Sequence, residues 1–198
     1  MFRPIRKKKN ELSTEDTRQI LREARRGVLA VNGEDGYPYA IPINFIYDET
    51  AGRIYFHSSR TGYKLDAIKV CDKVCFTAYG TEIVREEAWA PYMRSAVVFG
   101  RCRLLESTPE AMALLKRFAM KYYPDEALAD QAILEGGRAV RMCEIGLNTS
   151  AGKRYRSDKL PLNIHRSMRS GTVHLFAALP DATEKITASS IMLRPSNP

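Results

Sequence analysis

The chain has 198 residues, 44% of them hydrophobic and 27% charged, which is the composition of a globular protein with one domain and a fair core. It has no apolar run of about 18 residues for a membrane span and no secretory signal, so we expect a cytoplasmic protein. The net charge of +8 invites nucleic-acid binding, but the basic residues gather near the ends of the folded part, and no RNP-type, KH or zinc-finger signature is present. Nucleic acid is therefore not the expected partner, whereas an anionic small molecule remains open.

The first elements are a helix and a hairpin. The helix begins at Ser13, which can cap it together with Asp16 three residues later, and it ends at Gly27. A short apolar strand follows at residues 28–31, and the turn residues at 32–36 predict a hairpin.

The second strand of this hairpin, residues 37–47, contains Pro38 and Pro42. Because proline cannot donate to a sheet ladder, the strand is confined to an edge, a bulge or a place where a ligand covers the backbone. Side chains alternate between two faces. One face carries Tyr39, Ile41, Ile43, Phe45 and Tyr47, and the other Ala40, Pro42, Asn44 and Ile46.

The rest of the folded part continues the same pattern. Strands are predicted at residues 53–57, 73–79, 96–105 and 139–147, with a short helix at 64–70 and a second short helix at 125–134. Another helix begins at Thr108 and Pro109, buries Phe118 among other apolar residues and ends at Pro124. Six strands joined mostly by hairpins predict a mainly β, six-stranded antiparallel barrel with peripheral helices, not a doubly wound sheet.

The composition changes towards the C-terminus, where proline, serine and arginine are frequent. We therefore predict one domain at residues 1–155 and a tail at 156–198, in which only residues 172–179 have a strand pattern. His165 and His174 have no metal-ligand spacing around them, and no metal site is expected. The cysteines are too few for a disulfide framework and are expected to be reduced, buried thiols: Cys71, Cys75, Cys102 and Cys143.

The segment IYFHSSRTGYK, residues 54–64, carries the most specific chemistry. His57 stands at the end of an apolar strand, and Ser58 offers a hydroxyl immediately after it. Gly62 allows close approach to a ligand, and Lys64 lies at a helix N-terminus, where free N–H groups attract anions. This combination predicts a phosphate pocket, although it also fits an ordinary loop after a structural histidine. The known glycine-rich phosphate motifs are absent.

Several blocks of the sequence occur together and in order: MFRPIRKKK, GEDGYPYAIPINFIYD, IYFHSSRTGYKLDAI, DKVCFTAY, RSAVVFGRCRLL and SAGK. Over residues 1–155 the chain resembles the split-barrel flavin-nucleotide-binding proteins related to pyridoxamine 5'-phosphate oxidase. Within them it is most similar to the nitroimidazole-resistance (Nim) proteins. The resemblance implies a Greek-key split barrel and a homodimer that binds FMN at the subunit interface.

The resemblance also implies site residues. The segment Ile41, Pro42, Ile43 and Asn44 matches the strand whose backbone and side chains meet the isoalloxazine ring. His57 and Ser58 match the family's step beside the flavin, with His57 as the implicated active-site residue, and Lys64 matches its phosphate-binding base. Gly62 belongs to the same phosphate loop, and Ser95 and Val97 match a strand near the cofactor in the dimer. Here serine follows the histidine where Nim proteins have glycine, which adds a hydroxyl where a substrate would enter.

The function implied is an FMN-dependent oxidoreductase that reduces small electron acceptors such as nitroaromatics, with His57 as proton donor. Two alternatives remain open. One is a flavin-binding store or sensor without turnover. The other is a binder of nucleic acid or small anions that uses the same barrel without flavin.

Overall fold

The computed structural model describes residues 3–80, 83–85 and 90–154. All of them belong to one unit, Met1–Asp158, and a second unit, Lys159–Pro198, lies outside the described residues. The predicted tail and its strand at 172–179 are therefore not described, and the domain boundary stays a prediction. Within the part that is described, no helix is long and apolar enough to cross a membrane.

Four α-helices and three short 3-10 turns accompany the strands in the described residues. They are α1 (Thr14–Glu23), α2 (Tyr63–Val70), α3 (Pro109–Ala119) and α4 (Glu126–Gly136), with η1 (Lys8–Asn10), η2 (Glu34–Gly36) and η4 (Gly137–Ala139). The helix starts follow the predicted capping chemistry, because the side chain of Ser13 accepts the Asp16 N–H at 3.0 Å and that of Thr108 accepts the Ala111 N–H at 3.3 Å. Both helix starts are confirmed.

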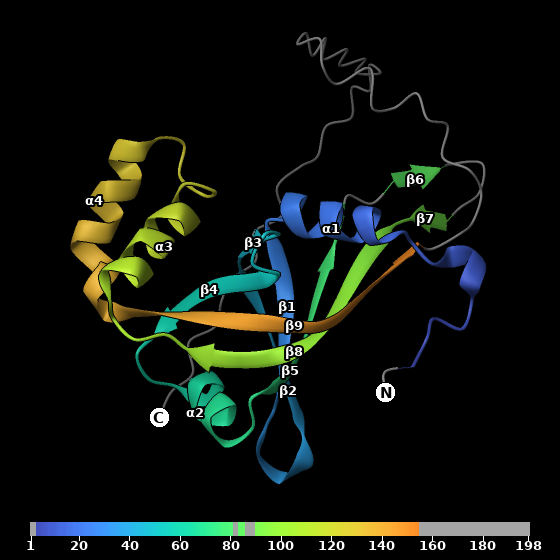
Figure 1. Cartoon of the computed structure of the whole chain (residues 1–198), viewed down its shortest axis with the longest axis horizontal. Helices are drawn as coiled ribbons and strands as arrows, with labels where there is room; N and C mark the ends of the chain where they lie inside the picture. The colour runs from blue at the N-terminus through green and yellow to red at the C-terminus, as the bar shows by residue number, and fades with distance from the viewer. Residues whose placement is uncertain (1–2, 81–82, 86–89, 155–198) are drawn as a thin grey trace, which may run out of the picture. The chain divides into compact units, whose positions relative to one another are not determined.

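One antiparallel seven-stranded sheet forms the body of the protein, in the order β2-β1-β5-β8-β9-β4-β3. Its strands are β1 (Arg26–Asn32), β2 (Pro38–Asn44), β3 (Ile46–Asp48), β4 (Arg53–Ser59), β5 (Lys73–Tyr79), β8 (Arg94–Leu104) and β9 (Val140–Arg154). A separate hairpin consists of β6 (Ile83–Arg85) and β7 (Ala90–Tyr92). The antiparallel, mainly β fold with peripheral helices is confirmed (Figure 1).

The sheet has seven strands instead of six because the predicted strand at 37–47 is broken at Phe45. The Phe45 side chain is fully buried, and its N–H donates to the Tyr122 hydroxyl at 2.7 Å instead of to a neighbouring strand. The two halves, β2 and β3, form the opposite edges of the sheet. A single bend therefore brings both edges together, and the sheet curls into a split barrel. The edge position predicted from the prolines is confirmed, since β2 pairs only with β1.

Two apolar clusters occupy the two faces of β4. The larger cluster fills the inside of the curled sheet and includes Phe45, Phe56 and Phe76. The smaller one lies on the outside, where α3 covers β4 and β9, and includes Phe118 and Met142. Figure 1 shows α3 and α4 side by side near the ends of β4 and β9. The end of β4 thus lies between the barrel interior and the α3 layer.

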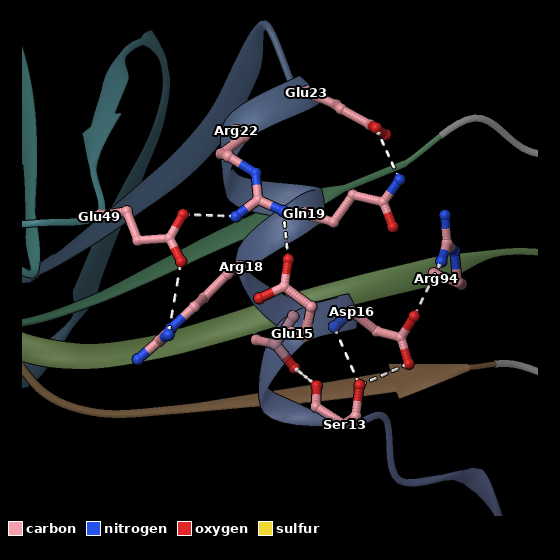
Figure 2. A network of polar contacts seen from close by, with 10 residues as sticks. Ser13, Glu15, Asp16, Arg18, Gln19, Arg22, Glu23, Glu49 and Arg94 are labelled. Carbon is pink, nitrogen blue, oxygen red and sulfur yellow. Dashed lines mark hydrogen bonds and ion pairs between the residues drawn. The ribbon is translucent and has the colours of Figure 1, made fainter.

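Polar contacts hold α1 against the sheet (Figure 2). Arg22 bridges Glu15 on its own helix and Glu49 in the turn after β3, and Arg18 also contacts Glu49, at 3.4 Å. Asp16 lies 3.7 Å from Arg94 of β8. These side chains are largely exposed, so each pair contributes only about 0.2–1 kcal/mol. The network orients α1, while burial of Ile20 and Leu21 attaches it.

Candidate functional site

The end of β4 divides its side chains between two environments. Phe56 and Ser58 face the barrel interior and are buried, whereas Tyr55 and His57 face the layer covered by α3. The alternation follows from the two-residue period of a strand. The structure therefore places His57 and Ser58 on opposite faces, although they are neighbours in the sequence.

His57 is half-buried against α3. Its ring meets the Phe118 ring edge to face, with centroids 4.8 Å apart. Its Nδ1 atom is buried and has no hydrogen-bond partner in the described residues. Burial lowers the pKa of His57 below its ordinary value, and the nearby charge of Lys64 lowers that pKa further. At neutral pH the imidazole is therefore neutral and holds one proton that it can share with a ligand.

Lys64 lies in the first turn of α2, with its ammonium 5.6 Å from the centre of the Phe56 ring. Among the described residues no carboxylate pairs with it. Burial lowers the pKa of Lys64. Cys143 and Cys102 lie close enough to act on it, but burial raises the pKa of Cys143 to about 11 and raises the pKa of Cys102 as well, so both thiols are neutral near pH 7. The Lys64 charge is thus half-buried without a compensating anion.

The cysteine prediction is confirmed in part. All four cysteines are free, and Cys102 and Cys143 are buried as expected. Cys71 and Cys75 are only partly buried, so the expectation was wrong for these two. Cys71 caps the end of α2, and Cys75 lies on the outer face of β5, where neither position reaches the barrel interior.

The turn between β4 and α2 depends on a glycine. Gly62 has a φ of 130°, a conformation that side chains with a Cβ rarely adopt, and it is the N-cap of α2. The N–H groups of Leu65 and Asp66 bond to its carbonyl, which starts the helix. The first N–H groups of the helix have no partner within it. The start of α2 therefore lies beside Lys64, and the phosphate pocket stays a prediction.

The predicted flavin-facing strand is divided between the two faces of β2. The side chain of Ile43 is buried in the barrel core and that of Ile41 packs against the same core, so these two residues can offer a ligand only their backbone. Pro42 and Asn44 lie on the outer face, where Asn44 accepts a bond from the Arg26 Nε at 3.4 Å. The contact of this strand's backbone and side chains with the isoalloxazine ring stays a prediction, in which the two isoleucines would contribute backbone.

Ser95 and Val97 lie on the same outer face. Val97 belongs to a row that runs across the strands through Thr77 and Val28 to Pro42. The row spans three strand spacings of about 4.8 Å each. The structure therefore places Ser58, Gly62 and Lys64 near the end of β4, with His57 on the opposite face of that strand. Pro42, Asn44 and Val97 lie on the outer face of the sheet, and Ser95 shares that face but is buried.

A cavity near β1, β5 and β8 has a volume of about 500 Å³, and none of the predicted site residues lines it. It is lined by Ala30, Val31, Asn32, Pro38, Lys73, Val74, Cys75, Phe99, Gly100, Arg101 and Asn148.

The chain matches a known protein family. A family model described as pyridoxamine 5'-phosphate oxidase matches residues 13–151. The chain belongs to this family. No curated protein matches it. The chain's membership rests on the segment that forms the curled sheet and its helices.

Solved structures share the fold of this pyridoxamine 5'-phosphate oxidase family member. A conserved hypothetical protein from Mycobacterium tuberculosis is 18% identical, with a TM-score of 0.63 over 80% of this chain and 94% of that one. A candidate 5-nitroimidazole antibiotic resistance protein from Bacteroides thetaiotaomicron is 20% identical, with a TM-score of 0.59 over 73% of this chain and 86% of that one. An FAD-binding protein from Mesorhizobium loti is also 20% identical, with a TM-score of 0.54 over 74% and 97%.

Two residues near the site have no signal in the sequence. Phe118 reads as an ordinary core position of its helix, yet it forms the surface against which His57 lies. Arg141 is the cross-strand partner of Ser58, and its Nε is buried without a partner in the described residues. No motif surrounds Arg141, because strand pairing alone brings it to the end of β4.

Proposed function

We propose that this pyridoxamine 5'-phosphate oxidase family member binds FMN, with the phosphate at the start of α2. One observation carries the proposal: the ammonium of Lys64 is half-buried, and none of the described residues supplies it with a carboxylate. A buried charge without a partner is costly, and a phosphate at a helix N-terminus relieves that cost. The FAD-binding relative from Mesorhizobium loti supports a flavin.

The residues at the end of β4 fit a phosphate group. Lys64 supplies the positive charge, and the glycine at 62 keeps the approach to the helix N–H groups free of a Cβ. The Ser58 hydroxyl is buried on the face of β4 that Phe56 and Lys64 share. These groups would hold the phosphate through charge-assisted hydrogen bonds, which are the stronger class of hydrogen bond.

The ring system would lie along the edge strand β2. One side of β2 has no strand beside it, so its backbone N–H and C=O groups are available to the polar rim of an isoalloxazine. Ile41, Pro42, Ile43 and Asn44 would contribute mainly backbone, given that the two isoleucine side chains belong to the core.

We further propose a homodimer with FMN at the subunit interface. Small or apolar side chains form a partly exposed outer surface on the sheet, in which Phe99 is 39% exposed. A twofold mate would cover this surface, and it would bring Ser95 and Val97 of one copy towards the flavin of the other. The separation of the predicted residues into two groups supports this arrangement, because a second chain supplies what one chain places far away.

The proposed activity is reduction of small electron acceptors such as nitroaromatics. When bound, FMN supplies the electrons as hydride or single-electron transfers. His57 would act as proton donor in its cationic form, which is favoured only below its lowered pKa, and the Phe118 ring packs against the imidazole. The candidate 5-nitroimidazole resistance protein that shares the fold supports a nitroaromatic acceptor.

The test begins with the purified protein titrated with FMN and, separately, with FAD. Quenching of flavin fluorescence gives both affinities, and FMN should bind more tightly. The FMN-loaded protein is then reduced with dithionite without oxygen and mixed with a 5-nitroimidazole. Reoxidation of the flavin in step with loss of the nitro absorbance supports the oxidoreductase.

A variant separates binding from turnover. His57→Gln should keep FMN affinity within about twofold and slow reoxidation by about 100-fold, the low end of what a positioned general acid contributes. If the protein binds FMN tightly but no acceptor reoxidises the reduced flavin, the protein is a flavin store or sensor and not an oxidoreductase. Absence of flavin binding would refute the whole proposal.

A further inference from the structure

A second group of cations lies on the other side of the end of β4. A cavity of about 110 Å³ is bounded by α3, the connection from α4 to β9 and the loop that follows β4. Arg60, Arg138 and Arg141 line its mouth together with Ser107, and Glu106 is its single acidic lining residue. Arg60 and Arg138 are exposed, and the rest of the wall is mainly apolar, with Leu105, Ala111, Met112, Leu115, Val140 and Met142. In the described part of the chain, none of these three arginines forms an ion pair with a carboxylate.

Arg60 is held in place within this cavity. Its Nε donates to the Arg138 carbonyl at 2.7 Å, and one terminal nitrogen donates to the Ser107 hydroxyl at 3.4 Å. A guanidinium has five N–H donors, so about three remain available after these two bonds. The side chain is therefore oriented in advance and still has donors to offer a ligand.

The opposite wall fixes the shape of the cavity. Gly137 is buried, and a Cβ at this position would approach Ile133 Cγ2 to 3.1 Å and Met112 Cε to 3.4 Å. Because Ile133 and Met112 pack closely against Gly137, the backbone just before Arg138 runs close to α3 and α4. Arg141 follows on β9 and is half-buried, but its pairing with Ser58 directs its side chain to the barrel face. Arg60 and Arg138 are therefore the two arginines on this side.

Elsewhere the chain neutralises its arginines. A larger cavity of about 630 Å³ is also lined by three arginines, Arg53, Arg101 and Arg103. There Glu144 pairs with Arg53 and Arg103, and Asp72 pairs with Arg101 at 2.6 Å. The two cavities differ in that only the smaller one leaves its arginines without acidic partners.

We propose that the smaller cavity binds a phosphate-sized oxyanion, at a site separate from the flavin. Drug-sized ligands occupy pockets of about 300–1,000 Å³, so this volume excludes a flavin and admits only a small anion or the phosphate end of a longer molecule. Arginine suits this ligand because its planar donors match two phosphate oxygens at once. The ligand is inorganic phosphate or a phosphate monoester.

Equilibrium dialysis with labelled inorganic phosphate tests the proposal on the full chain, at constant ionic strength and with or without saturating FMN. We expect saturable binding of about one phosphate per chain that FMN does not displace. In the double variant Arg60→Met with Arg138→Met, the affinity for phosphate should fall by about tenfold or more, which is the scale of a lost charged hydrogen bond. Arg103→Met is the matched control and should leave phosphate binding unchanged, because Arg103 lines the larger cavity and not the smaller one.

A second measurement guards against a folding defect in the double variant. Phosphate should raise the unfolding temperature of the unaltered protein and not that of the variant, since a ligand of the native state stabilises it by mass action. Competition by glycerol 3-phosphate identifies a monoester site, and its absence identifies a site for free phosphate.

Three outcomes would overturn the proposal. They are the absence of saturable phosphate binding, full displacement of phosphate by FMN, and loss of FMN affinity in the double variant, which would assign the arginines to the flavin. If phosphate binds as described while FMN does not bind at all, the flavin proposal fails and this one stands.

Discussion

Lys64 and Lys121 are both half-buried, but they have opposite relations to their surroundings. The ammonium of Lys121 donates to the Ala24 carbonyl at 2.7 Å and lies 4.5 Å from the centre of the Phe45 ring. The ammonium of Lys64 lies 5.6 Å from the Phe56 ring and has no carboxylate among the described residues. Lys121 therefore completes the protein's own structure, whereas Lys64 retains donors for something else. A half-buried cation indicates a ligand only where the fold has not already used its donors.

The surroundings of Lys121 explain its role. It follows α3 and lies beside Tyr122, whose hydroxyl accepts the Phe45 N–H at 2.7 Å and donates to a carbonyl of Phe45 or Arg25. Burial lowers the pKa of Lys121 to about 8, and the charge of Arg25 contributes to that shift. Both side chains hold the bend that separates β2 from β3.

The largest expected difference concerns flavin affinity. Lys64→Met should weaken FMN binding by about tenfold to 100-fold, because one charged hydrogen bond to the phosphate is lost. Lys121→Met should leave that affinity within about threefold. Fluorescence titration measures both. Equal losses in the two variants would end the distinction between a ligand-binding lysine and a structural one.

The next effect concerns the bend at Phe45. Tyr122→Phe removes the acceptor of a buried backbone N–H and should lower the free energy of unfolding by about 1–3 kcal/mol. Urea unfolding followed by circular dichroism measures the change. Tyr123→Phe is the control, since Tyr123 is 43% exposed, and it should change stability by less than about 0.5 kcal/mol. A similar loss in both variants would mean that the hydroxyl does not hold the bend.

A smaller effect follows from the pKa of Lys121. The folded protein releases this proton near pH 8, while the unfolded chain keeps it to about 10.5. Between these values the unfolded state binds more protons, so the free energy of unfolding rises as pH rises from about 8 towards 10.5, and this lysine contributes no pH dependence well below 8. Comparison of urea unfolding at pH 7 and pH 9.5 should show the unaltered protein gaining stability relative to Lys121→Met. A constant difference would contradict the burial of the charge.

The smallest effect comes from His57, whose pKa is lowered first by burial and then by Lys64. In the window between this lowered pKa and the ordinary value of 6.5, the unfolded state binds more protons, so stability falls as pH falls. His57→Gln should reduce that pH dependence. Lys64→Met should reduce it by a smaller amount, because loss of the Lys64 charge raises the pKa of His57 towards its ordinary value. Thermal unfolding between pH 5 and pH 8 measures both. An unchanged pH dependence in His57→Gln would show that the imidazole titrates normally.

Local chemistry predicted much of the fold. The capping residues Ser13 and Thr108 located two helix starts, because a side-chain oxygen at that position satisfies a free N–H. The prolines located the edge strand, because they remove ladder donors. Hairpin turns and strand alternation predicted an antiparallel sheet, since both are set by residues close together in the sequence.

The loop that carries Gly62 and Lys64 could be predicted for the same reason, because both residues lie within one turn of helix. Other features depend on contacts distant in sequence. Phe45 breaks its strand because Tyr122, 77 positions away, takes its N–H. Phe118 reaches His57 only when α3 folds over β4, and Arg141 reaches the end of β4 only by strand pairing.

The sequence by itself determined the elements, the sheet's edge and the loop that offers donors to an anion, because these follow from backbone chemistry within a few residues. The tertiary structure decided which charges are left without a partner. Lys64 and Lys121 cannot be distinguished by their neighbours in the chain, since burial and the positions of acceptors arise only when distant strands and helices pack together.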